Sequence, residues 1–112
     1  MSQRILVSRE QRIQQWMDDA MCDAYDEQEQ LSGFFTIIED SIKAPCEARV
    51  AGTPVSVLGV DMTDTRILAI CKRAHVRTKY RIDIRDVTID PKTPVSECID
   101  AYRRWSREDQ TL

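Results

Sequence analysis

Eight carboxylates lie between Asp18 and Asp40, and the same stretch contains no Lys or Arg. They are Asp18, Asp19, Asp23, Asp26, Glu27, Glu29, Glu39 and Asp40. On a helix, residues three or four apart are neighbours, and each like-charge pair costs about 0.2–0.5 kcal/mol. A hard cation relieves that repulsion, and calcium is the obvious ion because it takes about 6 to 8 oxygen ligands and favours carboxylates. The stretch is therefore predicted to bind calcium or to form a solvated acidic helix face.

The candidate calcium ligands fall in three groups along the chain. They are Asp23, Asp26 and Glu27, then Glu39 and Asp40, and finally Asp61 and Asp64. If residues 24–42 form one helix, Asp26 and Glu39 stand about 20 Å apart and cannot share an ion. We therefore expect two weak sites, or a site that Glu39 and Asp40 complete with loop groups such as Asp61, Asp64 or backbone carbonyls. Asp40 is the first candidate ligand to test by substitution, because it lies near a helix end where backbone oxygens are also available.

Other metal and catalytic chemistries find little support. The chain has no Asp-x-Asp-x-Asp-Gly loop, so an EF-hand is excluded as a motif. The four cysteines lie 24 to 27 residues apart without a Cys-x-x-Cys pair, and we expect reduced, mostly buried thiols and no zinc site. The single histidine, His75, falls in an expected turn between Arg73 and Arg77, and the three glycines form no phosphate loop. The protein is not expected to be an enzyme.

Length and charge limit the fold and the partners. A chain of 112 residues suits one domain, 1–112. Residues 1–42 hold nine acids and three bases, whereas residues 43–112 hold ten acids and thirteen bases. With a net charge of -3 the chain lacks the footprint of a nucleic-acid binder. No apolar run approaches the roughly 18 residues that span a bilayer, and the start of the chain, Met1–Arg9, has too short an apolar stretch for a secretory signal. We therefore expect a soluble cytoplasmic protein without membrane contact.

Two helices are expected in an acidic helical head, residues 8–43. Ser8 with Gln11 three positions later has the capping-box pattern and begins the first helix. We expect a break near Cys22 and Asp23, with Asp23 as the N-cap of a second helix. Pro45 ends that helix, because the residue before a proline avoids the helical region.

The pattern changes to short strands over residues 46–90. Apolar residues centred on Val57, Ala69, Ile82 and Val87 predict four or five antiparallel strands. The connections expected between them are a turn at 52–54, a loop at 61–64 and a hairpin at 73–77. A C-terminal helix follows over 93–108, with Thr93 as N-cap and Pro94 in its first position. We therefore expect an α+β fold in which N-terminal helices and a C-terminal helix pack around a small antiparallel SH3-like β-barrel.

The basic half of the chain offers a second function. Alternation in 79–85 places Lys79, Arg81, Asp83 and Arg85 on one face of a strand. This face is either an SH3-like protein- or RNA-interaction surface or a solvated outer sheet face, and Asp83 weakens any phosphate track.

Several short motifs resemble those of the CcbP-type cyanobacterial calcium-binding family. They are the run Asp23–Glu29, then Gly33-Phe-Phe, Ile38-Glu-Asp40, Ala44-Pro-Cys-Glu-Ala48 and Val55–Val60. The resemblance covers about residues 20 to 105 and implies a small, acidic, cytosolic protein that binds calcium through surface carboxylates, as a buffer or a sensor. It places the acidic segment of the family on Asp23, Asp26, Glu27 and Glu29, and its Glu-Asp pair on Glu39 and Asp40. The chain departs from the family in having Pro45-Cys46 in place of a Pro-Phe pair, and a more basic β-rich half.

Overall fold

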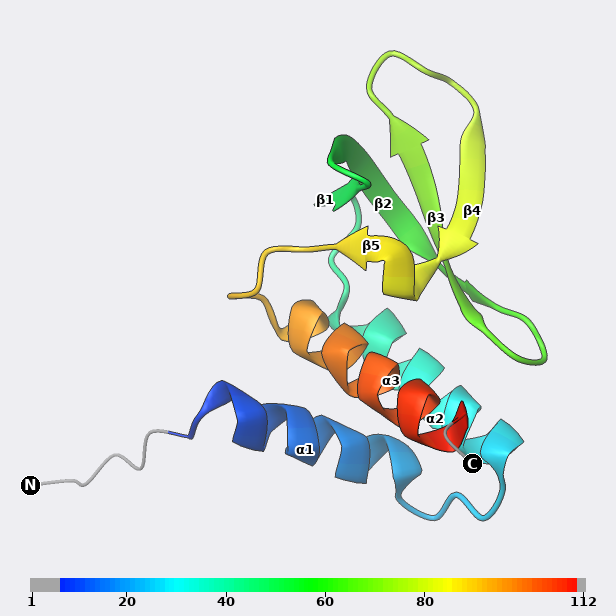
Figure 1. The fold of residues 1–112 in the computed structure, drawn as a ribbon. Coiled ribbons are helices and arrows are strands. Elements are labelled where there is room, and N and C mark those ends of the chain that lie inside the picture. Colours follow the sequence, from blue (N-terminus) through cyan, green and yellow to red (C-terminus); the bar gives the residue numbers. More distant parts are fainter. Residues whose placement is uncertain (1–6, 111–112) are drawn as a thin grey trace, which may run out of the picture.

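The computed structural model describes the backbone of residues 7–110 and the side chains of residues 7–107. Residues 1–6, which form most of the segment on which the secretory-signal prediction rests, lie outside this part. Figure 1 shows the elements in chain order. These are α1 (Arg9–Met21), α2 (Glu27–Ser41), β1 (Cys46–Val50), β2 (Thr53–Met62), β3 (Ile67–Arg73), β4 (Lys79–Asp83), the 3-10 turn η1 (Ile84–Asp86), β5 (Val87–Thr88) and α3 (Pro94–Gln110).

The start of α1 is as predicted. The backbone N–H of Gln11 donates to Ser8 Oγ over 3.2 Å, and the Ser8 N–H donates to Gln11 Oε1 over 2.9 Å. These two bonds complete the capping box. The helix ends at Met21, so the break expected near Cys22 is confirmed.

The predicted N-cap of α2 is wrong by three residues. Asp26 caps the helix, because its Oδ1 accepts the backbone N–H of Glu29 over 2.8 Å. Asp23 has a φ of 59°, in the left-handed region, and turns the chain between the two helices. The second helix nevertheless ends at Ser41, before Pro45, as expected.

The strands form an open sheet rather than the predicted SH3-like barrel. Their order is β4-β3-β2-β1-β5, and every pairing is antiparallel. β5 has two residues and pairs only with Arg49 and Val50 of β1, and among the described residues it does not meet β4. At the end of β4, Asp83 Oδ1 accepts the N–H of Arg85 over 2.9 Å. This bond starts η1, which takes Ile84 out of the strand that the sequence pattern predicted.

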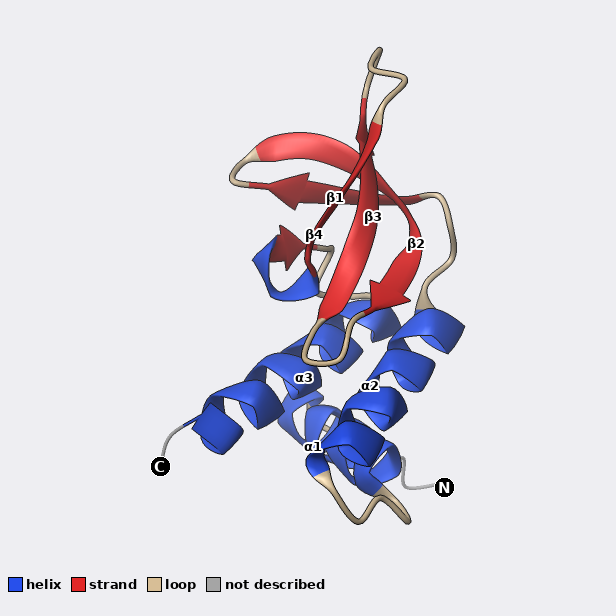
Figure 2. Ribbon diagram, turned by 90° about the vertical axis from the view of Figure 1, so that its right-hand side faces the viewer, coloured by secondary structure: helices blue, strands red, loops and turns tan. Residues whose placement is uncertain are grey.

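Three layers are visible in Figures 1 and 2: the sheet, then α2 and α3, and α1 on the side away from the sheet. The helices that cover the sheet meet it through a buried apolar core. The largest fully buried side chains are Tyr102, Phe34, Ile13, Leu31, Ile38, Ile67, Ile84 and Ile99. Tyr102 also ties α3 to β3, because its hydroxyl accepts the N–H of Ile67 over 3.3 Å.

The two N-terminal helices approach closely at Gly33. A Cβ on Gly33 would lie 1.9 Å from the carbonyl oxygen of Ala20 and 2.8 Å from its carbonyl carbon. A side chain at position 33 would therefore collide with the backbone of α1. This glycine sits inside α2 because the helix crossing requires it.

Candidate metal site

Two of the three groups of predicted ligands lie at opposite ends of α2. Asp26 caps the helix and Glu27 is its first residue, whereas Glu39 and Asp40 lie in its last turn. Because α2 is one continuous helix, the two ends are about 20 Å apart. One ion cannot bridge them, as the sequence argument expected for a single helix.

The N-terminal end of α2 meets the loop between β2 and β3. In Figure 2 this loop reaches down from the sheet to the helices. Asp26, Glu27 and Asp64 line one pocket of about 410 Å³. The remaining lining residues are Gln28, Leu31, Thr65 and Trp105. Sequence spacing gave no sign that Asp64 joins this end of the helix rather than the end that holds Asp40.

The loop that carries Asp64 is braced from within. Thr63 Oγ1 accepts the backbone N–H groups of Thr65, over 3.3 Å, and of Arg66, over 3.0 Å. The N–H of Thr63 in turn donates to the carbonyl of Arg66 over 2.8 Å. These bonds give the loop a defined shape, so Asp64 is held next to the helix end.

The C-terminal end of α2 holds an unusual pair of charges. Glu39 and Asp40 are exposed, and the last turn contains no basic residue. The C-terminus of a helix carries roughly half a negative charge, which favours cations and disfavours carboxylates. Helix stability therefore does not explain these two acids, whereas acids in the first turn of α2 are favoured by the dipole.

Several carboxylates elsewhere in the described chain are paired with arginine. Asp100 accepts from Arg9 and from Arg103 over 2.7 and 2.6 Å, and Glu97 accepts from Arg12 over 2.8 Å. Burial raises the pKa of Asp100, but the hydrogen bonds from the two arginines lower it by more, so it falls below its ordinary value of 3.8.

Four of the candidate ligands lack such compensation. No Lys or Arg nitrogen among the described residues lies within 4.0 Å of a carboxylate oxygen of Asp26, Glu39, Asp40 or Asp64. Asp61 differs, because it pairs with Arg81 over 3.1 Å and accepts the N–H of Met62 over 2.8 Å. The folded protein therefore leaves negative charge at both ends of α2.

The described side chains do not form a closed metal cage. Among them, no three His, Cys, Asp or Glu side chains converge closely enough to hold a metal ion. The pocket residues are hard oxygen donors of the type that calcium prefers, but they line the space without meeting in it. Such a donor set fits an ion that keeps much of its water.

Asp23 lies outside α2, three residues before its N-cap Asp26. It is exposed in the loop between α1 and α2, and the thiol of Cys22 donates to its Oδ2 over 3.8 Å. Among the pockets described, it does not line the one that Asp26 shares with Asp64.

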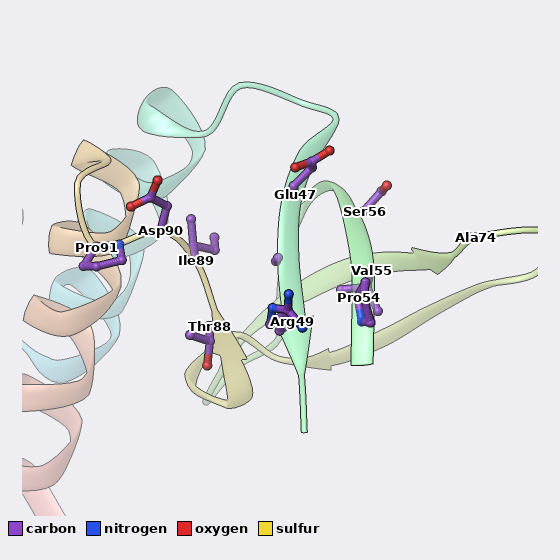
Figure 3. Close-up of a pocket in the computed structure, with 11 residues that line it drawn as sticks. Glu47, Arg49, Pro54, Val55, Ser56, Ala74, Thr88, Ile89, Asp90 and Pro91 are labelled. Carbon is purple, nitrogen blue, oxygen red and sulfur yellow. The ribbon is translucent and has the colours of Figure 1, made fainter. Parts of the chain in front are cut away.

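A second pocket, of about 560 Å³, lies beside β1 (Figure 3). It exists because β5 stops at Thr88, which leaves the beginning of β1 without a neighbour on that side. The carboxylates of Glu47 and Asp90 lie on different sides of the space in Figure 3 and do not converge. Asp90 Oδ1 also accepts the N–H of Lys92 over 3.0 Å, so it shapes the turn before α3.

In the described part of the chain, none of the helices combines the length and the apolar character that a bilayer crossing demands.

No protein-family model matches the sequence, and no curated protein matches it. Two solved structures resemble the fold. One is described as a calcium binding protein in the calcium-binding form; it aligns with a TM-score of 0.69 and 19% identity over 93% of each chain. The other is the crystal structure of Anabaena CcbP, with a TM-score of 0.71, 18% identity, and 93% of this chain and 95% of that chain covered. The chain therefore has the α+β fold of these two proteins, and its predicted resemblance to the CcbP-type family is confirmed at the level of the fold.

Proposed function

We propose that this protein binds calcium through the carboxylates at the two ends of α2. The observation that carries the proposal is the unbalanced charge of this helix in the folded state. Arginines pair with Glu10, Asp61, Asp83, Glu97 and Asp100 elsewhere, yet Asp26, Glu39, Asp40 and Asp64 have no basic partner among the described residues. A divalent cation supplies the missing charge.

We place one site in the pocket of Asp26, Glu27 and Asp64. Asp26 Oδ1 already accepts the N–H of Glu29, which leaves Oδ2 for an ion. Gln28 and Thr65 line the same pocket and add neutral oxygens. Water completes the shell, because calcium takes about 6 to 8 oxygens and accepts irregular geometry.

We place the other site at Glu39 and Asp40. Here the helix dipole works in favour of a cation, and the last carbonyls of α2 are additional oxygen ligands. Asp61 is left out of both ligand sets because it pairs with Arg81. Asp23 adds negative charge near the first site without lining its pocket.

The likeness of fold supports the same function. One of the two similar structures is of a calcium-binding protein in its calcium-binding form. Open, partly hydrated sites exchange ions readily, which suits a buffer or a sensor of calcium in the cytoplasm. The ion is the partner that this proposal requires.

Calcium-dependent stabilisation tests the proposal and its ligands. An ion that binds only the folded state adds about 2.7 kcal/mol at a hundred times its dissociation constant. For a domain of this size that raises the melting temperature by roughly 10 °C or more. The melting temperature of the metal-free protein is measured with and without calcium, and again with magnesium in its place.

Three variants, each of which removes one negative charge, distinguish the two proposed sites. We expect Asp64→Asn and Asp40→Asn each to reduce the calcium-induced rise. Asp61→Asn is the matched control and leaves the rise unchanged, because that carboxylate belongs to Arg81. An undiminished rise in both of the first two variants contradicts the ligand assignment, and no rise in the parent protein contradicts calcium binding itself.

A further inference from the structure

The β3–β4 hairpin is a strongly basic projection. In Figures 1 and 2 it extends away from the helices, at the end opposite to the loop between α1 and α2. Residues 71–82 contain five Lys or Arg residues and no acid. Lys72 of β3 pairs directly with Lys79 of β4. Like charges placed opposite each other destabilise a sheet, so the hairpin keeps its charge at a cost.

Four of the five cations of the hairpin have no acidic partner among the described residues, and the fifth, Arg81, pairs with Asp61. No carboxylate oxygen of the described residues lies within 4.0 Å of Lys72, Arg73, Arg77 or Lys79. The hairpin also bears an apolar feature, because Val76 at its tip is 40% exposed. The unpaired cations and the exposed Val76 together form a surface suited to an acidic partner with an apolar side chain.

The loop between α1 and α2 has complementary properties. Tyr25 is 88% exposed and stands between Asp23 and Asp26, and Met21 at the end of α1 is 37% exposed. The described part of the chain has four exposed large hydrophobic residues: Val7, Met21, Tyr25 and Val76. Three of these four lie on the acidic loop or on the basic hairpin.

A pocket beside the hairpin can receive an aromatic side chain. It has a volume of about 430 Å³ and is lined by Val50, Thr53, Arg73, Val76, Thr78 and Tyr80. Val50, Val76 and Tyr80 supply apolar surface, and Arg73 is one of the residues that line it. Tyrosine is a frequent anchor of protein interfaces, and its ring stacks well on a guanidinium group.

We propose that two copies of this chain associate head to tail, with Tyr25 of one copy in the hairpin pocket of the other. The acidic loop then faces the basic hairpin, and each supplies the charge that the other lacks. Within one molecule the contact is impossible, because the two surfaces lie at opposite ends (Figure 1). A polyanion such as RNA is the weaker candidate, since the chain has a net charge of -3 and Tyr25 would have no role.

Two variants that each destroy one side of the contact test the proposal. Tyr25→Ser removes the anchor, and Arg73→Glu reverses the charge at the pocket; both residues are exposed, so the fold is retained. Their controls are Val7→Ser, the exposed hydrophobic residue outside both surfaces, and Lys92→Glu, an equal charge reversal away from the hairpin. Sedimentation is measured in low salt, without calcium, at concentrations up to about 1 mM, where weak contacts form.

The parent protein and both controls are expected to associate as concentration rises, and salt is expected to weaken the association. Each of the two test variants alone should associate at least about tenfold more weakly. A mixture of the two should recover association, because the Arg73→Glu copy retains the loop and the Tyr25→Ser copy retains the hairpin.

A monomeric parent, a monomeric mixture, or test variants that associate like the parent would overturn the proposal. So would hairpin-dependent binding of single-stranded RNA by a protein that does not self-associate. Because no metal is present, failure here leaves the calcium proposal untouched.

Discussion

Replacing Gly33 by alanine should weaken the protein even though alanine is the better helix former. In an unobstructed helix the substitution gains about 1 kcal/mol. Here the added Cβ would lie 1.9 Å from the carbonyl oxygen of Ala20, whereas an ordinary carbon–oxygen contact is about 3.4 Å. The two helices would have to separate by roughly 1.5 Å at their crossing.

That separation disturbs the core that α1 and α2 share. Overpacking costs about 1–3 kcal/mol, and the upper value applies because the obstacle is helix backbone rather than a flexible side chain. After the gain in helix propensity, Gly33→Ala should lose about 2 kcal/mol of unfolding free energy. The melting temperature should fall by about 8–16 °C.

Urea unfolding followed by tryptophan fluorescence measures this loss. Ser32→Ala is the control, because it gives the neighbouring position of α2 the same residue without the collision. We expect Ser32→Ala to be close to the parent protein. If Gly33→Ala proves as stable as Ser32→Ala, the close crossing of α1 and α2 is wrong.

Two further predictions follow from titratable groups. The pKa of Asp100 is depressed in the folded state, so its stabilising effect is present above its ordinary value of 3.8 and is lost as the pH falls through the folded-state value. The urea midpoints of the parent and Asp100→Asn should therefore differ at about pH 5 and converge as the pH falls through the folded-state pKa of Asp100, and a constant difference would contradict this assignment. Burial raises the pKa of the Cys98 thiol to about 11, so iodoacetamide at about pH 8 should label exposed Cys22 first and reach Cys98 only on unfolding. Prompt labelling of Cys98 in the native protein, seen by peptide mass spectrometry, would show that the site is open.

Local chemistry made several elements predictable. The capping box at Ser8 and the Thr93-Pro94 start of α3 both rest on contacts within one helical turn, and both are confirmed. The hairpin connection between β3 and β4 is confirmed as well. The break between α1 and α2 was also located from the sequence, although the N-cap at Asp23 on which that prediction rested was wrong.

Closure of the sheet was not predictable in this way. The alternation of Tyr80, Ile82 and Ile84 predicts one strand that includes all three residues. In the structure β4 ends at Asp83, whose side chain accepts the N–H of Arg85, and Ile84 belongs to η1. The sheet stays open because the two-residue β5 pairs with β1 alone, and that pairing joins segments far apart in the sequence. The N-cap predicted at Asp23 was also wrong: Asp23 adopts a left-handed turn, and Asp26 caps the helix instead.

The grouping of candidate ligands also depends on tertiary structure. Asp61 and Asp64 are three residues apart, yet Asp61 pairs with Arg81 across the sheet while Asp64 reaches the pocket at the start of α2. Only the position of the β2–β3 loop above the helices separates their roles. The acid surplus of α2, in contrast, was visible from composition.

Calcium titration calorimetry of the metal-free protein, at physiological salt and with magnesium as competitor, tests the central claim most directly. The account predicts saturable heat that persists in magnesium and that decreases in Asp64→Asn and Asp40→Asn. Absence of heat, or heat that magnesium abolishes, would contradict it and would leave the acids of α2 as a solvated helix face.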